Sequence, residues 1–71
     1  MKTTMETKEY EQFKAKFLAL AANVPLSLRE EIIAVVDDDK PITWNVAYAE
    51  VKYDSEYSRE IIERMLQIGV L

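Results

Sequence analysis

Residues 32–53 read IIAVVDDDKPITWNVAYAEVKY, and the way this stretch folds decides the architecture of the chain. Its second half supports a strand through the alternating residues Ile42, Trp44, Val46 and Tyr48. The same half also supports a helix, because it places four apolar or aromatic residues at helical spacing, namely Trp44, Ala47, Tyr48 and Val51. We favour a helix over 42–53, because a lone hairpin of two strands is only marginally stable in water. Pro41 fits the approach to such a helix, and Thr43 is a good cap.

The segment before this stretch carries a helix-start signal. Ser27 and Glu30 stand three residues apart, as in a capping box, where each side chain bonds the backbone N–H of the other. We therefore predict a helix that ends near Val36, with an inner face formed by Leu28, Ile32, Val35 and Val36. The acidic run 37–39 is unfavourable at a helix C-terminus. Because it lacks the spacing of a calcium loop, we interpret it as a solvated loop.

Apolar residues at helical spacing predict two further helices. An N-terminal helix over 5–23 presents Tyr10, Phe13, Phe17, Leu20 and Val24 on one stripe. It should end before Pro25, since the residue preceding a proline disfavours helical geometry. A last helix should begin after Asp54 or Ser55 and end at Gly69. Its predicted inner face comprises Ile61, Ile62, Met65, Leu66 and Ile68.

The C-terminal residues carry a resemblance to a known family. The pattern consists of Pro41-Ile42-Thr43, Val51, a turn at Lys52-Tyr53-Asp54, then Ile62, Met65 and Gly69-Val70-Leu71. It is similar to the winged helix-turn-helix superfamily over residues 28–71. Tyr48 stands where the family usually has alanine, Lys52 replaces the usual turn glycine, and the wing would begin where the chain stops. The resemblance implies an all-α fold of four helices, with at most a minimal β element, whose last three form a wingless helix-turn-helix unit. We expect one domain over 1–71.

Composition excludes several classes of function. The chain has 71 residues, no Cys and no His, so the usual ligands of zinc are absent. We find no nucleophile paired with a base and no glycine-rich phosphate loop. We therefore expect no enzyme activity, no cofactor and no metal. The N-terminus lacks an apolar signal region, and no apolar run is long enough for a membrane span. We therefore expect a cytoplasmic protein that does not bind membranes.

Charge directs the choice between partners. Thirteen acidic and nine basic residues give a net charge of −4, and residues 54–71 are themselves acidic. A DNA-reading surface normally shows a basic face. We therefore expect a small protein–protein interaction module or accessory subunit, serving a complex that handles nucleic acid. The alternative is a dimeric winged-helix-like regulator that binds duplex DNA. The predicted contact residues are Tyr53, Tyr57, Arg59, Glu60 and Arg64.

The N-terminal helix leaves two alternatives open. It could lie across the back of the helix-turn-helix unit, covered by the rest of the same chain. It could instead pair with a second copy and form a homodimer. The residues that would make that dimer interface are Tyr10, Phe13, Phe17 and Leu20.

Overall fold

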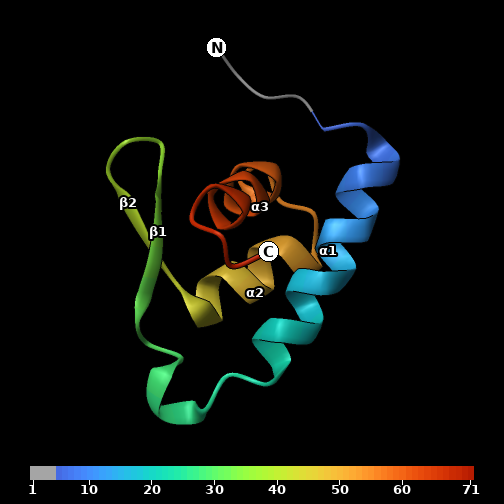
Figure 1. Ribbon diagram of the computed structural model, residues 1–71. Coiled ribbons are helices and arrows are strands. Elements are labelled where there is room, and N and C mark those ends of the chain that lie inside the picture. The colour runs from blue at the N-terminus through green and yellow to red at the C-terminus, as the bar shows by residue number, and fades with distance from the viewer. Residues whose placement is uncertain (1–4) are drawn as a thin grey trace.

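The computed structural model describes residues 5–71 as three α-helices and one β-hairpin (Figure 1). In chain order the elements are α1 (Thr7–Ala22), the 3-10 helix η1 (Leu26–Leu28), β1 (Ile32–Val36), β2 (Lys40–Thr43), α2 (Trp44–Lys52) and α3 (Ser58–Gln67). The prediction of an all-α fold with four helices is therefore wrong, since the described residues form a mixed α/β fold. Residues 1–4 lie outside the described residues. They belong to the domain expected over 1–71, and they begin the N-terminal region that is expected to lack a signal peptide.

The predicted second helix is the element that the structure corrects. Residues 32–36 form β1, which pairs antiparallel with β2 in a register that joins Val36 to Lys40 and Ala34 to Ile42. Four of the five residues in β1 are β-branched, and such side chains favour strands over helices. Val36 is buried whereas its neighbour Val35 is exposed, as successive residues of a strand are, and the register is irregular between Ile32 and Ala34. The expected helical stripe and the observed strand share the same apolar run.

The acidic run forms the turn of this hairpin. Asp37 and Asp38 have φ values of 53° and 65°. Aspartate tolerates this left-handed conformation better than most residues, and tight hairpin turns need it. The predicted capping box is also wrong. Ser27 lies exposed within η1, and the Glu30 carboxylate accepts a hydrogen bond from Asn45 Nδ2 at 3.2 Å.

The two C-terminal helices confirm most of the predictions made for them. The Thr43 hydroxyl caps α2 by accepting a hydrogen bond from the Val46 N–H at 3.2 Å, so β2 runs directly into the helix. Gly69, at φ 81°, ends α3 as predicted, and the Val70 N–H bonds the Met65 carbonyl at 2.9 Å, as in a Schellman motif. Two details differ. The helix begins at Ser58 rather than just after Ser55, and Ile68 is exposed rather than buried.

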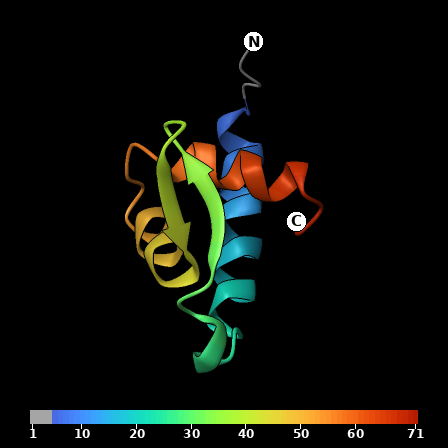
Figure 2. The ribbon, with the colours of Figure 1, turned by 90° about the vertical axis from the view of Figure 1, so that its left-hand side faces the viewer.

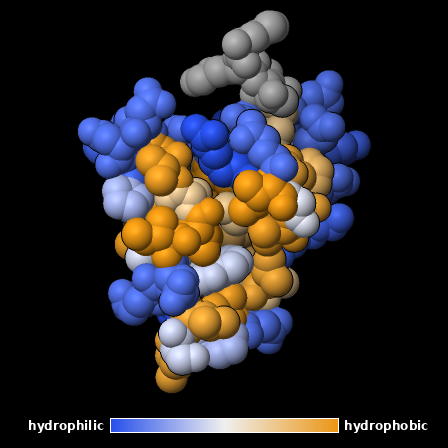
Figure 3. Space-filling model, turned by 60° about the vertical axis from the view of Figure 1, so that its left-hand side comes forward, coloured by the Kyte–Doolittle hydropathy of each residue, from blue (hydrophilic) through white to orange (hydrophobic). Residues whose placement is uncertain are grey.

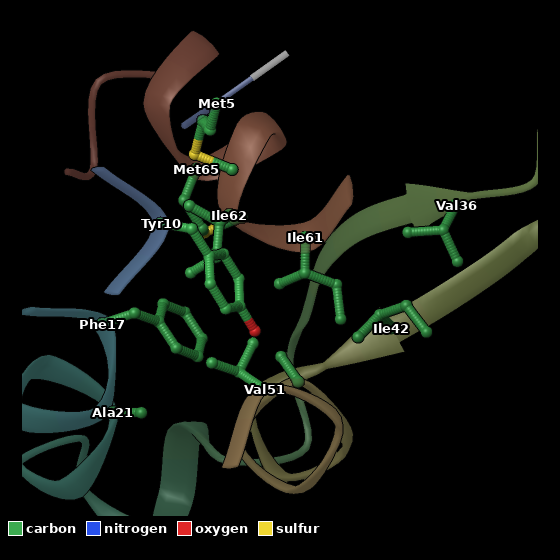
Figure 4. Close-up of a cluster of buried hydrophobic side chains, with 11 residues drawn as sticks. Met5, Tyr10, Phe17, Ala21, Val36, Ile42, Val51, Ile61, Ile62 and Met65 are labelled. Atoms are coloured by element: carbon green, nitrogen blue, oxygen red, sulfur yellow. The ribbon is translucent and has the colours of Figure 1, made fainter. Parts of the chain in front are cut away.

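The core forms where all these elements meet. α1 packs across α2 and α3, while the hairpin covers another side of the helix pair and contacts α3 through β1 (Figures 1 and 2). The hairpin is therefore not a lone sheet, because Val36 and Ile42 bury their side chains against the helices. Figure 4 shows the converging side chains, which include Tyr10, Phe17, Ala21, Val36, Ile42, Val51, Ile61, Ile62 and Met65.

Candidate functional site

The residues predicted to contact a partner are distributed over three places. Tyr57, Glu60 and Arg64 lie beside the hairpin turn. The Lys40 ammonium donates to the Tyr57 hydroxyl at 2.9 Å and lies 5.3 Å from the centre of its ring. The Asp37 N–H points to a Glu60 carboxylate oxygen at 3.4 Å, and that oxygen lies 3.9 Å from an Arg64 nitrogen. These three residues therefore connect α3 to the turn.

The other two predicted contact residues lie elsewhere. The Arg59 guanidinium lies 4.5 Å from the centre of the Tyr10 ring and donates to the Met5 carbonyl at 3.0 Å. It is therefore directed toward the N-terminal end of α1 and away from the hairpin turn. Tyr53 follows α2 and is 74% exposed, with the Lys52 ammonium 5.5 Å from the centre of its ring. Tyr53 is the most exposed of the predicted aromatic contacts.

The predicted dimer stripe on α1 is largely covered by the chain itself. Tyr10 and Phe17 are buried in the core, and the Phe17 ring stacks on Trp44 with their centres 5.9 Å apart. Phe13 is half-buried, and Leu20 is 38% exposed. The fold thus has the arrangement of the first alternative, in which the helix lies across the unit. A dimer through Tyr10 and Phe17 would require α1 to leave its own core.

A polar network that the sequence did not reveal joins α1 to the turn between α2 and α3. The Tyr10 hydroxyl donates to Asp54 Oδ1 at 2.7 Å and also bonds the Ser58 hydroxyl. The Lys14 ammonium donates to both Asp54 oxygens, at 2.8 and 2.9 Å. Asp54 has φ 54° and so occupies the left-handed turn position that glycine often fills. Because Ser58 is only 1% exposed, we interpret this network as structural, holding α1 against the turn between α2 and α3.

Asp54 should make stability depend on acidic pH. Hydrogen bonds from Lys14 and then from Tyr10 hold the pKa of this carboxyl below its ordinary 3.8. The stability that it contributes is therefore present above the unfolded-state pKa and is lost as the pH falls through the folded-state pKa. Asparagine also tolerates a positive φ, so Asp54→Asn should keep the turn. We expect the free energy of unfolding in urea to fall less for Asp54→Asn than for the parent as the pH is lowered from about 6 to about 3. Glu56→Gln is the control, and equal pH slopes for the parent and Asp54→Asn would contradict the assignment.

The outer edge of β1 is not paired with any other strand of the described residues. Within residues 5–71, β1 pairs only with β2, and outside that pairing its backbone makes one hydrogen bond, from the Asp39 N–H to the Val36 carbonyl. Groups directed away from β2 along the strand therefore remain free to pair. β2 contains Lys40 and Pro41, two residue types that natural edge strands use against unwanted pairing, whereas IIAVV contains neither.

Exposed apolar side chains lie on β1 and just beyond the end of α3. On β1, Ile32 is 60% exposed and Val35 is 43% exposed. At the end of α3, Ile68 is 61% exposed and Val70 is 40% exposed. Figure 3 shows apolar side chains gathered over the hairpin and across the face beside it. Exposed apolar side chains that gather on one face commonly mark an interaction site.

A small hollow in the described residues is a poor candidate for a ligand site. One shallow hollow of about 190 Å³ opens between the end of α1 and the start of α2, and this is below the usual size of a ligand pocket. It is lined by Ala21, Ala22, Arg29, Trp44, Asn45 and Tyr48. Within residues 5–71 no three acidic side chains converge as metal ligands would, and none of the helices has the length and apolar character needed to cross a membrane.

Comparison with known proteins gives no family assignment. No protein-family model matches the chain. Searches against curated proteins and against solved structures likewise give no match.

Proposed function

We propose that this chain is a small protein–protein interaction module, acting as an accessory subunit, that receives an extended segment of a partner along the free edge of β1. The observation that carries the proposal is the combination of an unpaired outer edge with an uncharged, proline-free strand sequence. Addition of a strand to a sheet edge is a recurrent mode of peptide recognition, in which backbone hydrogen bonds provide affinity and neighbouring side chains provide specificity.

The surroundings of β1 support the same function. A two-stranded sheet leaves the backbone groups on the outer side of each strand without a strand partner. A third strand would pair those of β1 and extend the sheet. The apolar residues beside the edge would lose their exposure to water on binding, which is favourable by about 25 cal/mol per Å² of apolar surface buried. Ile32 and Val35 would contribute most on the strand itself, and Ile68 and Val70 on the neighbouring surface.

A matched pair of variants tests this function. We expect Val35→Lys to reduce capture of the native partner at least tenfold, because a lysine on an edge strand opposes the docking of a further strand. Gln67→Lys, which adds the same charge at an exposed position of α3, should leave capture unchanged. Hydrogen exchange of the complex should show new protection over residues 32–36. Undiminished capture by a folded Val35→Lys protein, with no protection there, would remove the proposal.

A second candidate function is duplex-DNA binding by a regulator similar to the winged-helix proteins. It is favoured by one observation, the order of a short extended segment, a capped α2, a tight turn and α3. The charges oppose it, since Arg59 bonds Met5 and Arg64 lies beside Glu60. Binding to random duplex at low salt that weakens as salt rises would support this function, and absence of binding at low salt would remove it.

A further inference from the structure

We propose that the segment received by β1 has a basic residue at each end of a short alternating apolar run. This inference depends on the proposed function, because it describes the chemistry of the partner that would occupy the same edge. The physical basis is charge complementarity between that partner and the two ends of β1. The free edge supplies the pairing groups, and the charges select among strands that could use them.

Acidic side chains stand at both ends of the strand. Glu30 and Glu31 precede β1, and the hairpin turn that follows it contains Asp37, Asp38 and Asp39. All five residues are exposed. The five residues of β1 separate the two acidic groups by a strand length of about 17 Å. An apolar edge with negative charge at each end matches a strand of similar length with positive charge at each end.

These charges are mostly free to meet a partner. The Lys40 ammonium lies 4.0 Å from an Asp37 carboxylate oxygen. This is the only ion pair that the five acidic residues form within the described part of the chain. Glu30 accepts the hydrogen bond from Asn45. Glu31 and Asp39 have no such side-chain bond among the described residues. Lys40 therefore offsets part of the negative charge at the turn, while no cation of the described residues forms an ion pair with Glu30 or Glu31.

The same charges disfavour a second copy of this chain as the occupant. If two β1 strands paired antiparallel, the hairpin turn of each copy would approach the Glu30–Glu31 end of the other. If they paired parallel and in register, like ends would meet like ends. Both arrangements place carboxylates beside carboxylates, and like charges placed opposite each other oppose pairing. The acidic ends thus protect the edge against self-association while leaving it open to a basic strand.

A panel of three peptides tests the inference directly. The first is Lys-Lys-Val-Thr-Ile-Thr-Val-Lys-Lys, and the other two replace all four lysines with serine or with glutamate. We expect the lysine-ended peptide to bind about tenfold more tightly than the serine-ended one at low salt, and the glutamate-ended peptide to bind most weakly. The advantage of lysine should shrink as salt screens the exposed charges. Fluorescence anisotropy of labelled peptides measures all three affinities.

Charge-removing variants of the protein provide the matched control. We expect Glu31→Gln combined with Asp39→Asn, which removes one charge at each end of β1, to weaken binding of the lysine-ended peptide about threefold or more. Binding of the serine-ended peptide should not change. Glu11→Gln combined with Glu56→Gln removes two exposed charges from α1 and the α2–α3 turn and should leave both affinities as they are.

The possible results separate the inference from the function on which it depends. Equal affinity for the lysine-ended and serine-ended peptides would overturn the inference and leave edge docking intact. Failure of all three peptides would also overturn it, and the proposed function would then be judged by partner capture with Val35→Lys. A parent protein that dimerises in sedimentation experiments, and loses its dimer in Val35→Lys, would identify a second copy as the occupant and overturn the inference.

Discussion

Phe17→Ala is expected to lower the free energy of unfolding by about 3–5 kcal/mol. Phe17 is completely buried between α1 and α2, and its ring stacks on Trp44. Removing a buried phenylalanine side chain typically costs about 3–5 kcal/mol, from lost transfer free energy and the cavity left behind. A domain of this size has a total stability of about 4–10 kcal/mol, so the substitution removes a large share of it. Urea unfolding followed by circular dichroism and by Trp44 fluorescence measures the loss.

Leu20→Ala is the matched control for this prediction. Leu20 is on the same helix, but it is 38% exposed, so its truncation should cost less than about 1 kcal/mol. Both substitutions create alanine in α1, and a general change in helix propensity therefore cannot account for a difference between them. Similar urea midpoints for the two variants would show that α1 does not pack on α2 through Phe17.

Val36→Asp is expected to be nearly as damaging, and it tests the strand assignment. Val36 is fully buried in β1, where it faces the core with Ile42. The change loses the burial of an apolar side chain and places a carboxyl group in an apolar environment, at a combined cost of about 3 kcal/mol or more. The free energy of unfolding from urea titration is the measurement.

Val35→Asp serves as its neighbour control. In a strand, successive side chains point to opposite faces, and Val35 is 43% exposed. Its replacement should therefore change stability by about 1 kcal/mol at most. A helix over 28–36 would instead place both valines on the apolar stripe, and the two variants would then be damaged alike. Equal losses would contradict the hairpin.

The helices were largely predictable because their signals are local. The stripe of α1, the Thr43 cap of α2 and the Gly69 end of α3 each depend on residues within a few positions of one another. Each signal corresponds to a hydrogen bond or a buried face that the chain forms within the element or against its nearest neighbours. The start of α3 was misplaced by a few residues, because Ser55 bonds the Tyr57 N–H in the turn before the helix.

Tyr57, Glu60 and Arg64 are half-buried, and the grouping of the predicted contact residues was not predictable from the sequence. Tyr57, Glu60 and Arg64 are brought to Lys40 and Asp37 by the packing of the hairpin on α3. The network of Tyr10, Lys14, Asp54 and Ser58 joins residues that are 40 to 48 positions apart in the sequence. No local pattern marks such a network, since its partners are neighbours only in the folded chain.

The sequence by itself determined where chain segments could be helical or apolar, because propensity, capping and periodicity act over short distances. For 32–36 the sequence pattern predicted a helix and the structure has a strand, since a continuous apolar run satisfies both periods. The tertiary structure made that choice. The helices supply the surface on which the hairpin buries Val36 and Ile42, and this burial stabilises a two-stranded sheet that would be marginal alone. The free edge of β1 exists only because of that packing.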